Sequence, residues 1–160
     1  MIRNAELKDY EQIKALVYEV HKLHLENRPD IYVDGNPLPI EYFKDIIDSE
    51  NSFCYVYEEK GDIKGVITIS KKKNNNIPIA KERTTFFIED IVVASDCRRK
   101  GIGKKLYNYI QNKAIEENID AIELNVWAFN QNAIKFYESL GMTIKNMKFE
   151  KNIKWNILLF

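Results

Sequence analysis

The feature that most constrains this chain is a junction at which a strand-like segment passes into a helix. Residues 88–93 (Ile-Glu-Asp-Ile-Val-Val) form a largely apolar, β-branched run, and residues 102–114 carry apolar side chains at helical spacing. Between them lies 98–103 (Arg-Arg-Lys-Gly-Ile-Gly), with two glycines and three cations. A strand that leads through a short loop into an amphipathic helix predicts a sheet with that helix packed on it.

The rest of the chain divides into helical and extended segments. Apolar side chains at helical spacing predict helices over residues 9–27, 39–47, 101–114 and 132–140. Alternating or β-branched runs predict strands over residues 53–57, 63–69, 84–93 and 121–126, with one or two more within 143–160, while the polar run 71–76 predicts a solvated loop. This order predicts an α/β (α+β) fold, with a mixed, mostly antiparallel central sheet flanked by helices, in a single domain over residues 1–160.

Composition narrows the class of protein. With 160 residues, 45% of them hydrophobic, the chain is long enough to bury a core. No apolar run approaches the ~18 residues of a membrane span, and the N-terminus lacks the pattern of a secretory signal. The two cysteines form no CxxC pair, which predicts a cytoplasmic protein without a metal site. Zero net charge and the lack of aromatic residues among the loop cations predict no nucleic-acid partner, and we expect a monomer or a homodimer.

Charge is distributed unevenly along the chain. Residues 1–62 carry 14 Asp and Glu against 7 Lys and Arg, whereas residues 63–160 carry 10 against 17. A basic half suits an anionic cofactor and an acidic half suits a cationic substrate, because a charged surface raises the local concentration of its counter-ions. Solvent-exposed charges with no binding role would give the same asymmetry. Both a binding role and no role for these charges are therefore open.

The 98–103 loop combines the parts of an anion site. Glycines let backbone N–H groups approach a ligand, and a helix N-terminus and three cations add positive potential, which suits a phosphate. A Walker loop would need GxxxxGK followed by Ser or Thr, which is absent, and a dinucleotide fingerprint would need a third glycine where Leu106 stands. A tight turn between strand and helix is the remaining interpretation.

Two segments together resemble the signatures of the GNAT superfamily of acyl-coenzyme A N-acyltransferases. Arg98-x-x-Gly101-x-Gly103, after a strand and at the start of a helix, resembles the superfamily's pyrophosphate loop. Asn130-x-x-Ala133-x-x-Phe136-Tyr137-x-x-x-Gly141 is similar to its second signature. The signatures cover roughly residues 84–143, and the order of the predicted elements extends the resemblance over the whole chain.

The resemblance implies that the protein binds acetyl-coenzyme A. Main-chain N–H groups of the loop would hold the pyrophosphate, and the backbone of the preceding strand would pair with the pantetheine arm as an added strand does. Asn130 would contact the cofactor, although an Asn there also serves as a helix N-cap. The implied cofactor-binding residues are Ile91, Val93, Arg98, Arg99, Lys100, Gly101, Ile102, Gly103, Lys104 and Asn130.

The same resemblance implies roles for three further side chains. Tyr137 stands at the superfamily's usual general-acid position, near the cofactor sulfur, and packing of its ring on the sheet is the alternative. Glu89 and Asp90 interrupt an apolar strand, where polyamine and glucosamine-phosphate acetyltransferases carry a similar acidic pair. We expect Glu89 to act as the base, directly or through a water, and Asp90 to bind a cationic amine; a structural ion pair is the alternative. Adjacent strand residues point to opposite faces, so only one of the two is expected to line the site.

The function implied is transfer of the acetyl group of acetyl-coenzyme A to a primary amine by direct attack, without a metal. A small cationic amine, such as a polyamine or a lysine-like compound, is the favoured acceptor, because acceptor-side elements in this superfamily come largely from the N-terminal part, which here is acidic. The alternatives are acetylation of a protein N-terminus or lysine side chain, and a non-catalytic, regulatory coenzyme A-binding domain.

Overall fold

The computed structural model describes residues 1–154, and contacts within the chain divide it into two compact units. Unit 1 covers Met1–Asn125, and unit 2 begins at Val126. No helix within residues 1–154 is both long enough and apolar enough to cross a membrane.

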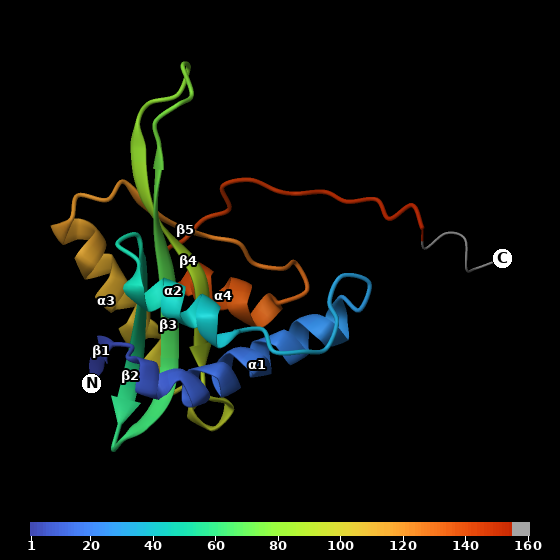
Figure 1. Cartoon of the computed structure of the whole chain (residues 1–160). Helices are drawn as coiled ribbons and strands as arrows, with labels where there is room; N and C mark the ends of the chain where they lie inside the picture. The colour runs from blue at the N-terminus through green and yellow to red at the C-terminus, as the bar shows by residue number, and fades with distance from the viewer. Residues whose placement is uncertain (155–160) are drawn as a thin grey trace. The chain divides into compact units, whose positions relative to one another are not determined.

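Unit 1 is built around a five-stranded sheet in the order β1-β2-β3-β4-β5 (Figure 1). Neighbouring strands pair antiparallel, except that β4 and β5 pair in parallel. The strands are β1 (Ile2–Asn4), β2 (Ser52–Glu59), β3 (Asp62–Asn74), β4 (Arg83–Val93) and β5 (Ala121–Leu124).

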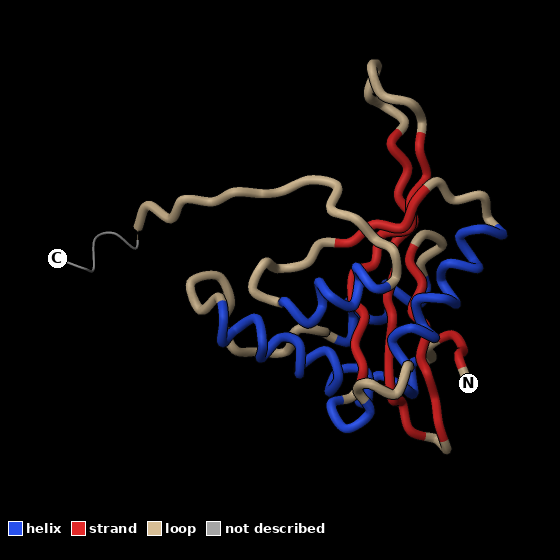
Figure 2. The backbone as a smooth tube through the Cα atoms, turned by 180° about the vertical axis from the view of Figure 1, so that it is seen from behind, coloured by secondary structure: helices blue, strands red, loops and turns tan. Residues whose placement is uncertain are grey.

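Helices cover both faces of this sheet (Figures 1 and 2). On one face, α1 (Tyr10–Asn27) and α2 (Ile40–Asp48) bury an apolar core against Val56 and Val66. On the other face, α3 (Ile102–Glu116) buries its predicted stripe and approaches β3 closely at Gly65, where a Cβ atom would meet side-chain atoms of α3 at 3.0 Å. The predicted fold class, a mixed and mostly antiparallel sheet flanked by helices, is confirmed.

The sheet departs from the predicted strands in two places. Strand β3 continues through Asn74, so the polar residues 71–74 form half of a long hairpin with β4 and not the predicted loop. This hairpin extends beyond the rest of the sheet (Figure 1), and Lys71 and Lys73 pair there with Glu117 and Glu82. Backbone pairing sustains the hairpin without the apolar alternation on which the prediction depended. The short edge strand β1 was not predicted.

Unit 2 contains the helix α4 (Gln131–Ser139). It ends as predicted at a glycine, Gly141, whose φ of +84° lies in the left-handed region that glycine tolerates best. The strands expected within 143–160 are wrong for 143–154, where no strand forms and where the apolar side chains of Ile144 and Phe149 are exposed. Residues 155–160 lie outside the described residues.

Asp9, at the start of α1, forms an ion pair with Arg3 of β1. Its carboxylate is 4% exposed and accepts two hydrogen bonds from the Arg3 guanidinium, at 2.7 and 2.9 Å, and one from the backbone N–H of Glu6 at 2.8 Å. The guanidinium holds the pKa of Asp9 below its usual range. The stability that this pair contributes is therefore present at neutral pH and is lost as the pH falls through the lowered pKa.

Replacing Asp9 with Ala is expected to lower the free energy of unfolding by about 2 kcal/mol, because Arg3 then keeps its contact with Glu58 but loses that with Asp9, and the backbone N–H of Glu6 loses its acceptor. Urea denaturation at neutral pH measures the change. Glu11 provides the control, since its carboxylate is exposed and its one ion pair within residues 1–154 is with Lys14, and its replacement by Ala should change stability by less than about 1 kcal/mol. Equal effects of the two substitutions would contradict the structural role of Asp9.

Candidate active site

A β-bulge in β4 brings Glu89 and Asp90 to the same face of the sheet. Asp90 pairs with Thr68 of β3, but the next β3 residue, Ile69, pairs with Ile88, so Glu89 is the extra residue. The Ser70 hydroxyl donates to the Glu89 carboxylate at 2.7 Å. Since Ser70 and Thr68 share one face of β3, Glu89 and Asp90 both lie on the face that α1 and α2 cover. The assumption that the two side chains point to opposite faces is therefore wrong, because alternation fails at a bulge; of the two, Glu89 lines the cavity described below.

The two carboxylates differ in their surroundings. Burial raises the pKa of Asp90 to about 6, with a further increase from the neighbouring charge of Glu89. No hydrogen-bond donor of residues 1–154 contacts the Asp90 carboxylate. The Glu89 side chain is more accessible, and besides Ser70 it has the Lys72 ammonium 3.5 Å away. Asp90 is thus a carboxylate that changes protonation close to neutral pH, whereas Glu89 is a solvated, partly paired anion.

The second half of β4 has one edge without a strand partner in the described chain. The parallel pairing with β5 covers only Thr85 to Ile88, whereas β3 pairs with β4 as far as Val93. The backbone of Ile91 and Val93 therefore lies on a free edge of β4, where an extended ligand could pair as an added strand. The carbonyl of Val93 also accepts a hydrogen bond from Nε of Arg98 at 3.5 Å.

The loop between β4 and α3 exposes the start of the helix. Gly101 is the N-cap residue with φ of +78°, and no side chain of the described residues caps the helix there. The backbone N–H of Lys105 makes the first intrahelical bond, to the carbonyl of Gly101, so the N–H groups of Ile102, Gly103 and Lys104 lack helical acceptors. A Cβ atom placed on Gly101 would have none of the neighbouring atoms within 4 Å, so the space beside this residue is open. An anion could therefore approach these N–H groups directly.

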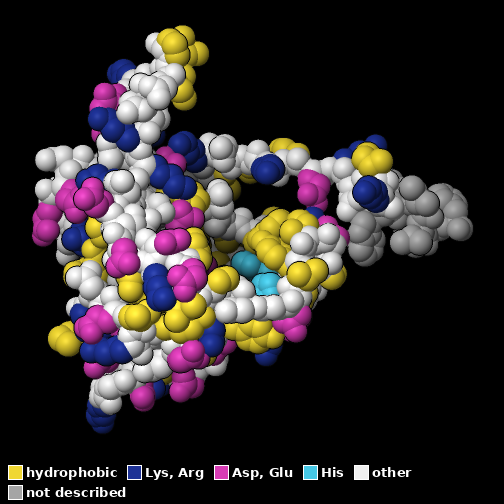
Figure 3. Space-filling view, in the orientation of Figure 1, with side chains coloured by type: hydrophobic (Ala, Val, Ile, Leu, Met, Phe, Trp, Pro, Cys, Tyr) yellow, Lys and Arg dark blue, Asp and Glu magenta, His cyan; other side chains and the backbone are white. Residues whose placement is uncertain are grey.

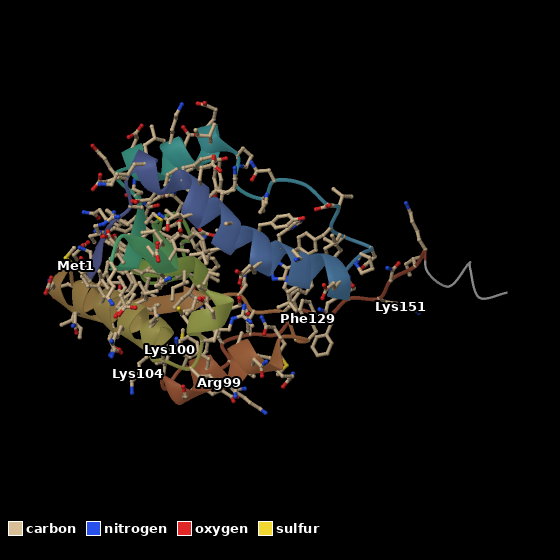
Figure 4. All side chains as sticks on the ribbon, turned by 90° about the horizontal axis from the view of Figure 1, so that it is seen from below. Met1, Arg99, Lys100, Lys104, Phe129 and Lys151 are labelled. Atoms are coloured by element: carbon tan, nitrogen blue, oxygen red, sulfur yellow. The ribbon has the colours of Figure 1, made fainter. Side chains whose placement is uncertain are left out.

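The cations of this loop fall into two groups. Arg99, Lys100 and Lys104 are exposed and form no ion pair within residues 1–154, and Figure 4 shows them together around the start of α3. Arg98 instead turns back toward α1, where its guanidinium lies 3.6 Å from the Glu19 carboxylate. The structure thus brings the predicted loop residues Arg98 to Lys104 together, with three free positive charges beside the uncapped helix end.

A cavity of about 250 Å³ lies on the same face of the sheet as the carboxylate pair. It is bounded by α2 and strands β2, β3 and β4, and its lining includes Tyr42, Asp45, Thr68, Ser70 and Glu89. Apart from Glu89, these residues were not predicted from the sequence. The available signal was weak: Thr68 and Ser70 are polar residues at β3 positions on the core-facing side of the strand. Within residues 1–154, no group of three His, Cys, Asp or Glu side chains is arranged to hold a metal ion.

The remaining predicted site residues lie in unit 2. Asn130 is the N-cap of α4, because its side-chain oxygen accepts a hydrogen bond from the backbone N–H of Ala133 at 3.2 Å. The capping role considered for Asn130 is therefore confirmed. Tyr137 lies in α4, with its ring 5.4 Å from the ring of Phe136. Contacts of Asn130 and Tyr137 with a cofactor remain predictions.

The chain belongs to the GNAT acetyltransferase family, since residues 17–142 match the model of the Acetyltransferase (GNAT) family. In structure it is similar to a single-site mutant of the BH1408 protein from Bacillus halodurans, with a TM-score of 0.93 and 31% identity over 96% of this chain and 99% of that chain. Aminoglycoside N-acetyltransferase AAC(6')-Iy, in a complex with CoA, shares the fold at 14% identity, with a TM-score of 0.71 over 95% of this chain and 98% of that one.

A curated relative is similar over a shorter stretch. L-Ornithine N5-acetyltransferase NATA1 of Arabidopsis thaliana is 36% identical over 69 residues, which are 43% of this chain and 30% of that protein. The matches span less than two thirds of the length of the curated relatives.

Proposed function

We propose that the protein transfers the acetyl group of acetyl-coenzyme A to a primary amine of a small cationic molecule. The observation that carries the proposal is the uncapped start of α3 with its three free cations, directly after a strand that carries two carboxylates on one face. Family membership and the ornithine acetyltransferase relative support this chemistry. Because the family match runs from unit 1 into unit 2, we take residues 1–160 to act as one acetyltransferase domain.

The residues present fit the cofactor. Acetyl-coenzyme A supplies an acetyl group activated as a thioester, together with phosphates that need neutralisation. The N–H groups of Ile102 to Lys104 and the side chains of Arg99, Lys100 and Lys104 would bind the pyrophosphate. The backbone edge at Ile91 and Val93, which β5 does not cover, would bind the pantetheine arm, and Arg98 and Asn130 complete the predicted contacts.

The structure favours an exchange of the roles expected for the two carboxylates. A proton acceptor works best when its pKa lies near the working pH, and burial brings the pKa of Asp90 to about 6. We therefore assign proton transfer from the attacking amine to Asp90. Glu89 is more exposed and already contacts the Lys72 ammonium, so it suits attraction of a cationic acceptor. In this assignment Tyr137 keeps its predicted role and donates a proton to the departing thiolate.

An assay of thiol release from acetyl-coenzyme A with a panel of amines tests the proposed function. The panel should contain short diamines, ornithine, an aminoglycoside and a lysine-containing peptide. We expect release that depends on both acetyl-coenzyme A and a small cationic amine. Release with the peptide alone would favour the protein-acetylating alternative. Tight binding of acetyl-coenzyme A with no release for any amine would favour the non-catalytic, regulatory alternative.

Replacing Gly101 with Ala is expected to weaken binding of coenzyme A about tenfold, because an L-residue resists φ of +78° and its methyl enters the space in front of the helix start. Gly61 is a matched control, since it has φ of +87° and equally open surroundings but lies in the β2–β3 turn. Both substitutions should cost about 1 kcal/mol of stability, and only Gly101→Ala should raise the dissociation constant in calorimetric titration. Equal affinities of the two variants would place the cofactor elsewhere.

A further inference from the structure

Several polar side chains reach the cavity beneath α2, next to an apolar lining to which Ile46 contributes. Tyr42 and Asp45 contribute from α2, Thr68 and Ser70 from β3, and Glu89 from β4. Its volume of about 250 Å³ lies just below the usual range for small-molecule pockets, so it suits a short chain with a polar end better than a bulky ring system. Its hydroxyl groups can each accept a hydrogen bond from an N–H donor.

The charges around this cavity favour a cation. Asp45 forms no ion pair within residues 1–154, and the Asp90 carboxylate lies beside Glu89 on the same face. Within residues 1–154, the cation that faces Glu89 is Lys72, and its ammonium also lies 3.7 Å from the ring centre of Phe87. Figure 3 shows that Asp and Glu side chains on the face of unit 1 that α1 and α2 cover alternate with Lys and Arg side chains. An ammonium group that entered the cavity would thus meet uncompensated carboxylate charge and several hydroxyl acceptors.

The cavity also lies close to the backbone that would hold the reacting thioester. Glu89, which lines the cavity, precedes Ile91 by only two residues in β4. One molecule can therefore reach both places if a short aliphatic chain joins its two polar ends.

We propose that this cavity binds a second ammonium group of the acceptor, so that the substrate is a short aliphatic diamine. The inference rests on the proposed acetyltransferase function and adds to it the substrate class and a specificity-determining residue. That residue is Asp45, whose carboxylate holds the ammonium that does not react.

Kinetics with 1,4-diaminobutane and butylamine, at saturating acetyl-coenzyme A, test the inference. The two amines have the same carbon chain and differ in the second ammonium group. We expect wild-type kcat/KM to favour the diamine at least tenfold. Asp45→Asn should reduce this preference about tenfold, mainly through the KM of the diamine, as loss of a charge-assisted contact implies. Asp48→Asn is the matched control, because Asp48 is an exposed carboxylate of the same helix outside the cavity lining, and the preference should stay at its wild-type value.

The outcomes separate the inference from the proposed function. Equal kcat/KM for diamine and butylamine in the wild type would overturn the inference while the acetyltransferase function stands. A preference for the diamine that Asp45→Asn leaves intact would also overturn it, since the second ammonium group would then bind elsewhere. No acetylation of any amine would overturn the proposed function, and the inference with it.

Discussion

Replacing Asp90 with Asn is expected to lower kcat/KM about a hundredfold or more and, at the same time, to make the fold more stable. Asn keeps the shape of the side chain but cannot accept the proton that the attacking amine must lose, a contribution typical of general-base catalysis. In the wild type an inflection of kcat/KM is expected near pH 6, where Asp90 ionises, and the variant should lack it.

The gain in stability has a defined pH dependence. The pKa of Asp90 rises from about 3.8 to about 6 on folding, so the folded state holds its proton more tightly than the unfolded state. The wild type therefore loses stability between about pH 4 and pH 6, by about 2 to 3 kcal/mol in total, and stays at that lower level above pH 6. The Asp90→Asn variant has no carboxyl group here to ionise. In urea denaturation its free energy of unfolding should therefore equal that of the wild type near pH 3.5 and exceed it by the full amount at pH 7.

Glu89→Gln is the matched control for this prediction, because it removes the neighbouring carboxylate of the same bulge. We expect it to raise the KM of a cationic amine and to retain the inflection at a lower pH, because the charge of Glu89 contributes to the raised pKa of Asp90. If Glu89→Gln abolishes the inflection while Asp90→Asn retains it, the assignment is reversed and Glu89 is the base, as the sequence analysis expected.

Replacing Tyr137 with Phe is expected to lower kcat about a hundredfold with little change in the KM of acetyl-coenzyme A. The substitution removes only the hydroxyl that would protonate the departing thiolate, an effect confined to the transition state. Single-turnover kinetics with a diamine measure it. The variant retains the ring and its contact with Phe136.

Tyr109→Phe serves as control for the loss of a tyrosine hydroxyl, since Tyr109 lies on α3 with its ring 5.0 Å from that of Tyr55. It should leave kcat unchanged. A Tyr137→Phe variant with wild-type kcat would exclude Tyr137 as the acid and leave its ring with a packing role alone.

Periodic burial explains which elements could be predicted from the sequence. Ile110 and Leu106 of α3 are fully buried, as their helical spacing predicts, and the strand beginning at Arg83 is recognised from its β-branched run. Elements without a buried face leave no such pattern. Residues 71–74 are held by backbone pairing across a hairpin, and β1 has only three residues, too few to show a period.

The arrangement of the carboxylates could not be predicted for a related reason. A bulge is a mismatch between two paired strands. The sequence of neither strand alone, β4 with Glu89 or β3 with Thr68, therefore reveals it. The cavity residue Asp45 was missed because residues of α2, β3 and β4 line one cavity only in the folded chain, and an exposed helical Asp is an ordinary surface residue. The anion loop was predictable because one continuous segment contains all of it.

The most direct test of the central claim is the simultaneous measurement of free coenzyme A thiol and N-acetylated amine after incubation of the wild-type protein with acetyl-coenzyme A and 1,4-diaminobutane. Direct transfer predicts that the two products appear in equal amounts and that no acetylated protein forms when the amine is omitted. Thiol release without acetylated amine, or binding of acetyl-coenzyme A without either product, would contradict the proposed N-acetyltransferase activity.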